Sequence, residues 1–233
     1  MTWEPDDRDE NELQPSYAMR EYLAEIYRLQ EDSPTVSTTA LAERLNVSAP
    51  AIPRMLRRLQ SAGYVERVPY YGSQLTELGR QEALREIRRH RILEVFLVKL
   101  MGFTWDEAHE HSEVMGRGLN EAISERMAQM TNHPTRCPHG EPIPDVNGVL
   151  PEVNDICIMN LGVGQKGAVS RVRTHEPEKL QYFAKLGLVP GADFEIVGRA
   201  PFNGPMRLRV GRDDNVVLGA ELTKSLWVSR AEE

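Results

Sequence analysis

Two histidine–glutamate pairs are the residues best suited to chemistry in this sequence. His90 and Glu94 are four residues apart, and so are His109 and Glu113. On a helix this spacing places both side chains on one face, about 5–6 Å apart at Cβ. Imidazole nitrogen and carboxylate oxygen, without thiolate, are ligands for Mn(II), Fe(II), Co(II) or Zn(II). Two antiparallel helices that each present such a pair could therefore converge on one divalent cation.

The same two pairs have a simpler interpretation. Histidine and glutamate at helical spacing are common, and the four side chains could form two inter-helix salt bridges on a solvated face. However, Ile87, Leu97 and Met101 extend the face of the first pair with apolar side chains. Polar groups in an apolar stripe need partners, because burying them unpaired costs several kcal/mol. Spacing alone leaves both interpretations open.

The elements that must position these pairs follow from apolar periodicity. Residues Thr76 to Met101 predict a long helix that ends at Gly102, and Trp105 to Met130 predict a second helix. The stretch Asn132 to Pro151 is rich in Pro, Gly, His and Asn and predicts a linker. Its Cys137-Pro138-His139 is a lone Cys-x-His sequence, which we interpret as structural.

The N-terminal part predicts a DNA-binding fold. A helix is expected from Ser16 to Gln30, a short one at Ala40–Leu45 and another at Ala49–Ala62, followed by two extended runs between Tyr64 and Leu75. Two short helices joined by a tight turn and followed by a hairpin are the layout of a winged helix–turn–helix. The alternative is a winged-helix module that contacts only protein.

Local charge supports DNA as the partner, although the whole chain carries a net charge of -7. Between Arg44 and Arg91 there are ten arginines and four acids, all glutamates. This local field matters more than the total, since screening acts over about 8–10 Å. The helix expected at Ala49–Ala62 opens with small residues that let the backbone approach base edges. Its arginines could reach guanine or phosphate. The expected DNA contacts are Thr38, Ser48, Ala49, Pro50, Arg54, Arg57, Arg58 and Tyr71.

Composition and missing motifs exclude several classes of protein. No apolar run approaches the ~20 residues needed to cross a bilayer, and the acidic first residues do not resemble a secretory signal. Two cysteines fit a reducing cytosol, so we expect a cytoplasmic protein without a membrane partner. The sequence has no HExxH, nucleophile elbow or Gly-rich phosphate loop, which argues against a metal-dependent hydrolase. We therefore expect no catalytic residues and no enzyme activity.

Several motifs together resemble the diphtheria toxin repressor family, the metal-dependent repressors of iron and manganese uptake. The resemblance runs from Ser16 through almost the whole chain. It implies a metal-loaded homodimer that binds a palindromic operator in double-stranded DNA. The motifs are Glu21-Tyr22-Leu23-Ala24-Glu25-Ile26-Tyr27, Ser48-Ala49-Pro50, His90-Arg91, the Cys137–Pro144 segment and Gly187-Leu188-Val189-Pro190-Gly191.

The resemblance also implies a domain organisation. After Glu152, short β-type runs separated by glycines predict a small β-barrel, which in the long family members is an SH3-like (FeoA-like) domain. The fold class is then mainly α with a small β-barrel. The expected parts are a disordered acidic tail at 1–15, a winged helix–turn–helix domain at 16–80, a helical dimerisation and metal-binding domain at 81–135, a linker at 136–151 and the SH3-like domain at 152–233.

One family metal site, called ancillary, takes two histidines and a glutamate from the helices. The resemblance places these on His90, Glu94 and His109. In the family this site is completed from the SH3-like domain by a glutamate and a glutamine. The glutamate position holds Glu176, but the glutamine position holds Lys179, which cannot ligate while it is charged.

At the second metal site of the family, called primary, this sequence departs further from the family pattern. Iron-type members use a methionine and a cysteine where manganese-type members use carboxylates, and Glu21 and Glu113 fall on these two positions. The resemblance therefore implies Mn(II), with Fe(II), Co(II), Cd(II) or Zn(II) as other ions. The following Glu-His pair of the family falls on Gly116 and Arg117. A shifted register over Glu107–His111 restores the spacing but removes a ligand of the ancillary site, so we adopt the ungapped register.

Two other functions stay open at this point. One is an iron(II)-dependent repressor with the same fold, which a titration with several metals would distinguish. The other is a metal-independent winged-helix protein with an SH3-like ligand domain.

Overall fold

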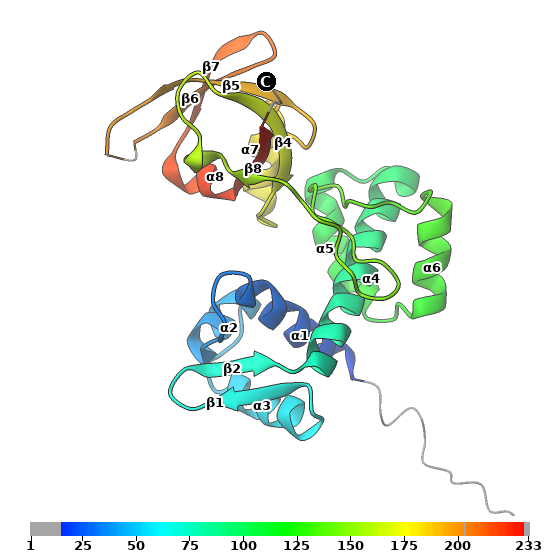
Figure 1. Ribbon diagram of the computed structural model, residues 1–233. Helices are drawn as coiled ribbons and strands as arrows, with labels where there is room; N and C mark the ends of the chain where they lie inside the picture. The colour runs from blue at the N-terminus through cyan, green and yellow to red at the C-terminus, as the bar shows by residue number, and fades with distance from the viewer. Residues whose placement is uncertain (1–14, 203, 231–233) are drawn as a thin grey trace, which may run out of the picture. The chain divides into compact units, whose positions relative to one another are not determined.

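The computed structural model describes residues 15–202 and 204–230 (Figure 1). The chain divides into two compact units between Ile87 and Arg88. The acidic tail predicted at 1–15 lies, except for Pro15, outside the described residues. Within the described residues, no helix is long and apolar enough to cross a membrane.

The first unit has three helices followed by a two-stranded antiparallel hairpin, as the sequence predicts for a winged helix. The leucine and isoleucine side chains of the helices form its core together with residues of the hairpin. Each fully buried aliphatic side chain contributes about 1.5–3 kcal/mol relative to an exposed one. The elements are α1 (Tyr17–Gln30), α2 (Thr38–Leu45), α3 (Ala51–Ser61), β1 (Val65–Val68) and β2 (Gly72–Leu75).

Local signals explain how these helices begin and end. The Ser37 side chain accepts a hydrogen bond from the backbone N–H of Ala40 and caps the start of α2. Asn46 ends α2 in the left-handed conformation, at φ 50°. The sequence predicts the next helix from Ala49, but a turn over Ser48–Pro50 comes first and α3 begins at Ala51.

The hairpin is attached to the helices through a close backbone approach. Val36 and Ser73 form an isolated antiparallel bridge. Gly72 lies beside this bridge at φ +124°, and a Cβ at this position would meet the Val36 carbonyl oxygen at 2.3 Å. Only glycine therefore fits here.

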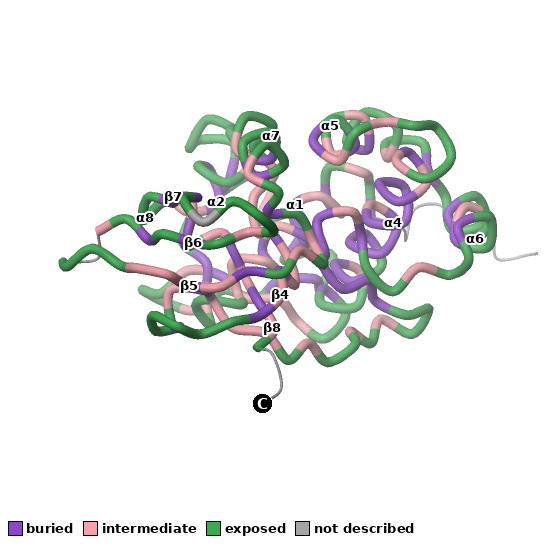
Figure 2. The backbone as a smooth tube through the Cα atoms, turned by 90° about the horizontal axis from the view of Figure 1, so that it is seen from above, coloured by how far each residue is buried: buried purple, intermediate pink, exposed green. Residues whose placement is uncertain are grey.

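The second unit begins with three helices, namely α4, whose first residues belong to the first unit, α5 and α6. The sequence predicts one helix from Trp105 to Met130, which is wrong. Gly118 lies in a break between two helices, and the Asn120 side chain caps the second of them. The bounds are α4 (Glu77–Met101), α5 (Trp105–Gly116) and α6 (Glu121–Met130). Figure 2 shows the buried stretches that recur along α4.

The segment after α6 packs tightly against α4. Residues 137–144, which we call the 137–144 loop, are almost all buried. Cys137 and Ile143 join Ile92 and Val95 of α4 in one apolar cluster. The loop closes on itself where the backbone N–H of Cys137 donates to the Glu141 carbonyl at 2.9 Å.

The C-terminal part of the second unit is an antiparallel sheet of six strands in the order β3-β8-β4-β5-β6-β7. Its apolar side chains pack with α7 around a core that contains Phe183. The edge strands β3 and β7 do not pair with each other in the described residues, so the closed barrel expected from the sequence is not seen there. The elements are β3 (Ile156–Cys157), η2 (Ile158–Asn160), β4 (Lys166–Val172), α7 (Pro177–Lys185), β5 (Asp193–Arg199), β6 (Met206–Val210), β7 (Asp213–Leu218), α8 (Ala220–Ser225) and β8 (Leu226–Arg230).

Candidate metal centre and nucleic-acid interface

Helices α4 and α5 bring His90, Glu94 and His109 together. Nε2 of His90 and Nδ1 of His109 each lie 3.1 Å from Oε1 of Glu94, and these two nitrogens are 3.1 Å apart. Neighbouring ligands of an octahedral ion bound at about 2.1 Å lie about 3.0 Å apart. The three atoms therefore have the spacing of one face of a coordination shell. The donor set and its geometry fit a divalent metal ion.

The groups around the two histidines hold their rings in place. The far nitrogen of His109, Nε2, lies 3.3 Å from Oε1 of Glu113. Ser112 Oγ lies 3.1 Å from Nε2 of His90 and donates to the His109 carbonyl at 2.7 Å. Metal-binding histidines commonly donate their second N–H to a carboxylate, which fixes the ring and its tautomer. Glu113, expected as a ligand, is thus positioned behind His109.

The central charged group of the cluster is Glu94, a residue that is only 1% exposed. Burial alone would raise its pKa, but His139 and His90 hold it well below the ordinary value. Burial alone would lower the pKa of His139, but Glu94 and Cys137 raise it to about 11. For His109, burial also acts downward, while Glu113 and Glu94 raise the pKa overall. The buried carboxylate thus favours positive charge at this place.

Three residues beside this cluster were not among the predicted ligands. His139 is fully buried, and its Nδ1 lies 3.6 Å from Oε2 of Glu94 and 3.8 Å from Sγ of Cys137. The His175 ring stacks on His109, with centroids 4.0 Å apart. The sequence signals were the Cys-x-His spacing in a segment interpreted as structural, and a histidine next to Glu176.

Two further predicted ligands, Glu176 and Glu21, are found elsewhere in the chain. Glu176 is the exposed N-cap residue of α7, and its Oε1 lies 2.7 Å from Nζ of Lys179. Lys179 also pairs with Glu221 at 2.7 Å. Glu21 is half-buried on α1, in the first unit. Its role, like that of Glu176, stays a prediction.

The residues of the shifted register have other roles. Glu107 accepts hydrogen bonds from the backbone and side chain of Thr104, which forms a capping box at the start of α5. The His111 ring lies against Phe103, with centroids 4.5 Å apart. Gly116 and Arg117 are the last residue and the C-cap of α5. The ungapped register, which uses His109 beside Glu94, stays a prediction.

Helix α3 has one buried and one exposed side. Ile52 and Leu59 are fully buried in the core of the first unit. The arginines of α3 project from the other side. All residues expected to contact DNA are exposed, namely Thr38, Ser48, Ala49, Pro50, Arg54, Arg57, Arg58 and Tyr71.

Between residues 44 and 91, fewer arginines carry an unneutralised charge than the count from the sequence suggests. Arg54, Arg57, Arg58 and Arg67 have no ion pair in the described part of the chain. The other arginines between positions 44 and 91 are neutralised by glutamates. Positive charge is thus left on α3 and the hairpin. The neutralising pairs are Arg44–Glu25, Arg80–Glu77, Arg85–Glu82, Arg88–Glu125, Arg89–Glu121 and Arg91–Glu141.

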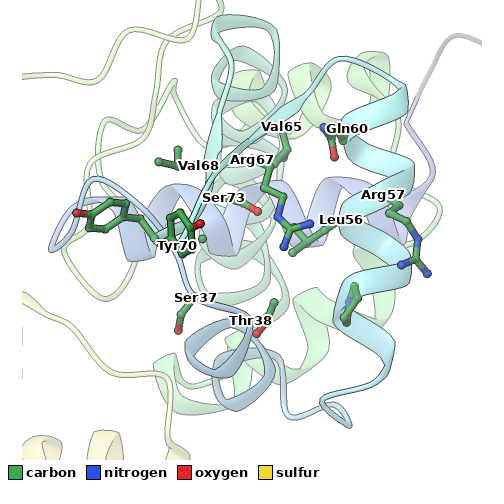
Figure 3. Close-up of a pocket in the computed structure, with 13 residues that line it drawn as sticks. Ser37, Thr38, Leu56, Arg57, Gln60, Val65, Arg67, Val68, Tyr70 and Ser73 are labelled. Carbon is green, nitrogen blue, oxygen red and sulfur yellow. The ribbon is translucent and has the colours of Figure 1, made fainter.

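A cavity of about 400 Å³ lies between α3 and the hairpin. Figure 3 shows Arg67 reaching from the hairpin toward α3, with Arg57 on the helix itself. Thr38, Tyr70 and Tyr71 also line the cavity, and the Tyr70 side chain is fully exposed. Guanidinium and hydroxyl groups around a hollow are donors suited to the phosphates of a nucleic-acid backbone.

Three family profiles match the chain in succession. The iron dependent repressor N-terminal DNA binding domain matches residues 16–73. The iron dependent repressor metal binding and dimerisation domain matches residues 76–145. The FeoA domain matches residues 157–230.

Full-length relatives agree with these matches. The iron-dependent repressor IdeR of Mycobacterium tuberculosis strain H37Rv is 28% identical over 232 residues, which cover 94% of this chain and 99% of the relative. A solved manganese-dependent transcriptional repressor in complex with manganese is 33% identical, with a TM-score of 0.85 over 91% of this chain and 100% of that one. The structure of ScaR with bound Zn²⁺ is 26% identical, with a TM-score of 0.79 over 91% of this chain and 99% of that one.

Proposed function

The chain belongs to the iron-dependent repressor family of metal-dependent, DNA-binding transcriptional repressors, and we propose that Mn(II) activates it to bind a palindromic operator as a homodimer. We further propose that it represses genes of metal uptake. The manganese complex of the 33% identical repressor supports this ion. Fe(II) is the second candidate, because two histidines and one carboxylate on one face also suit Fe(II) and IdeR is named for iron.

The observation that carries the proposal is the convergence of His90, Glu94 and His109 at 3.1 Å. A bound divalent cation supplies positive charge against Glu94 and links α4 to α5. Glu113 orients His109 for this role. We assign Glu21 and Glu176 as further oxygen ligands. Glu176 must first leave Lys179, and exposed ion pairs of this kind contribute little to stability.

The DNA-reading part of the proposal rests on α3 and the hairpin. The small residues at the start of α3 let its backbone approach base edges in the major groove. Arg54 contacts a base or phosphate, while Arg57 and Arg58 contact phosphates. In a dimer the two α3 helices would read half-sites about 34 Å apart. Metal must bind the DNA-competent state more tightly than the other state in order to shift the equilibrium.

The proposal is tested by DNA affinity measured against a panel of divalent ions. We expect Mn(II) to tighten binding most, and His90→Ala to abolish the effect. His133→Ala is the matched control, because His133 is exposed and lies outside the cluster. Equal DNA affinity with and without every ion tested would contradict the proposal, and so would a His90→Ala variant with unchanged metal dependence.

A further inference from the structure

We propose that the acidic N-terminal segment, residues 1–14, binds a groove of α3 arginines on its own chain when DNA is absent. The segment competes with DNA phosphates for these arginines. The contact itself goes beyond the proposed function, whereas the competition rests on the proposed DNA binding by α3. Residues 1–14 lie outside the described residues, but the groove and the start of α1, where the segment joins the fold, are both described.

The groove, which we call the α3 groove, lies between the first turn of α1 and the exposed side of α3. It has a volume of about 510 Å³ and is lined by Met19, Ser61, Ala62 and three arginines of α3. The sequence of α3 contains no acidic residue, and these arginines have no ion pair in the described part of the chain. Three guanidinium groups around one hollow favour a negatively charged occupant. They belong to Arg54, Arg57 and Arg58.

The N-terminal segment joins the fold beside this groove. Pro15 is buried, and its carbonyl oxygen accepts a hydrogen bond from Nη1 of Arg20 at 3.1 Å. The Ser16 side chain accepts a hydrogen bond from the backbone N–H of Met19 and caps α1. Met19 itself lines the α3 groove, so the segment starts about one helical turn from it. A chain extends up to about 3.6 Å per residue, which places every acidic residue of the segment within reach.

The charge of the segment is complementary to that of the groove. Residues 1–14 contain six acidic residues and a single arginine. Carboxylates and guanidinium groups form charge-assisted and often bidentate hydrogen bonds. Each exposed pair contributes little by itself, but a short tether makes the contact intramolecular, with an effective concentration in about the millimolar range. The six acidic residues are Glu4, Asp6, Asp7, Asp9, Glu10 and Glu12.

DNA is able to displace such a contact. A duplex presents about one phosphate charge per 1.7 Å of its axis, and binding releases condensed counterions. The segment offers fewer charges, and their pairs with arginine are exposed to solvent. The segment therefore lowers the affinity of α3 for every DNA sequence by the same factor, because it competes for phosphate contacts and not for base contacts.

A nitroxide on the segment tests the contact without DNA. Thr2→Cys carries the nitroxide in the full chain with Cys157→Ser, while Cys137 is buried. We expect the nitroxide to broaden the backbone amide signals of α3 in NMR spectra. The broadening should disappear at 1 M salt, where the Debye length is about 3 Å. It should also disappear in the tail-neutral variant, which carries Asp6→Asn, Asp7→Asn and Asp9→Asn.

Three results of this measurement would overturn the contact. The first is a set of α3 amide signals that stays sharp in the labelled chain at low salt. The second is broadening that is unchanged in the tail-neutral variant. The third is broadening that arises only between nitroxide-labelled chains and isotope-labelled chains without nitroxide, because the segment would then reach a second copy.

DNA affinity at about 0.1 M salt tests the competition. The tail-neutral variant should bind specific and random duplexes about tenfold more tightly than wild type. The matched control makes the same change in net charge on exposed residues of the second unit, with Glu152→Gln, Glu178→Gln and Asp193→Asn. It should change affinity by less than about twofold, since exposed charges beyond a Debye length are screened.

Equal DNA affinities of the tail-neutral variant and the matched control would overturn the competition. The nitroxide measurement uses no DNA, so its result decides the contact even if α3 fails to bind an operator. Failure of the proposed function and failure of the contact are therefore told apart.

Discussion

Two sets of arginines, on α3 and on α4, show how one residue type serves two purposes in this chain. On α3 the guanidinium groups are exposed and have no ion pair in the described part of the chain. In the middle of α4, three arginines are about 9% exposed, and each meets a glutamate. The first set is Arg54, Arg57 and Arg58, and the second is Arg88, Arg89 and Arg91.

The difference lies in what surrounds each helix. Only one side of α3 packs on a core, so its other side stays available for phosphates. In α4, arginines reach α6 and the 137–144 loop, while His90 and Glu94 of the same helix meet α5. Helix α4 therefore has a structural side held by ion pairs and a side that carries the candidate metal centre. Counting arginines along the sequence cannot separate these two uses.

The largest effect on stability is expected for Arg91→Ala. Arg91 donates to the Pro142 carbonyl and pairs with Glu141 at 3.3 Å, all within a buried region. Its loss leaves a buried carbonyl unsatisfied and weakens a buried ion pair, and we expect the free energy of unfolding to fall by about 3 kcal/mol. Urea unfolding measures this change. Arg85→Ala, at an exposed pair with Glu82, should change it by less than about 0.5 kcal/mol; similar losses in both variants would remove the distinction.

Arg54→Ala on α3 is expected to weaken DNA binding and to leave the stability of the fold unchanged. Specific DNA binding should weaken by about 1–3 kcal/mol if the side chain reads a base. The free energy of unfolding should stay within about 0.5 kcal/mol, because Arg54 is exposed. Fluorescence anisotropy with specific and random duplexes measures the first quantity. Unchanged affinity for the specific duplex would show that α3 does not read DNA through this residue.

A third prediction concerns Glu25, which pairs with Arg28 and Arg44 within the first unit. Burial alone would raise the pKa of Glu25, but Arg28 and Arg44 lower it overall. The ion pairs therefore stabilise the fold above the unfolded-state pKa of about 4.3, and this stability is lost as pH falls through the lower folded-state pKa. Glu25→Gln should be less stable by about 1–2 kcal/mol at neutral pH.

The pH dependence separates this effect from a general loss of packing. Unfolding curves of wild type and Glu25→Gln, measured by circular dichroism, should converge as the carboxylate of Glu25 is protonated. A stability difference that persisted unchanged at acid pH would show that the charges of Arg28 and Arg44 are not responsible.

The smallest effect is expected for Arg57→Ala. A phosphate contact carries no sequence information, so affinity for specific and random DNA should fall about equally. The slope of log affinity against log salt should decrease in magnitude by about one. An Arg57→Ala variant with an unchanged salt slope would place this guanidinium away from the phosphates.

The sequence could predict contacts between residues that are close along the chain, but not contacts between residues that are far apart along it. His90 and Glu94 are one helical turn apart, so their shared face follows from local periodicity. The α5–α6 break was missed because apolar periodicity continues across it, although Gly118 and Asn120 mark the position. His139 was interpreted as structural because its approach to Glu94 depends on how the 137–144 loop folds back on α4, which no local pattern encodes. Whether the C-terminal sheet closes into a barrel depends in the same way on non-local strand pairing, and the edge strands β3 and β7 do not pair in the described residues.

The central claim is that divalent metal at His90, Glu94 and His109 and operator DNA on α3 are coupled. Calorimetry of Mn(II) binding, with the full chain alone and with the chain saturated by a selected operator duplex, tests it most directly. Linkage requires DNA to tighten Mn(II) binding by the factor by which Mn(II) tightens DNA binding, and we expect at least about tenfold, or 1.4 kcal/mol. Identical Mn(II) affinity in the two titrations would contradict the account.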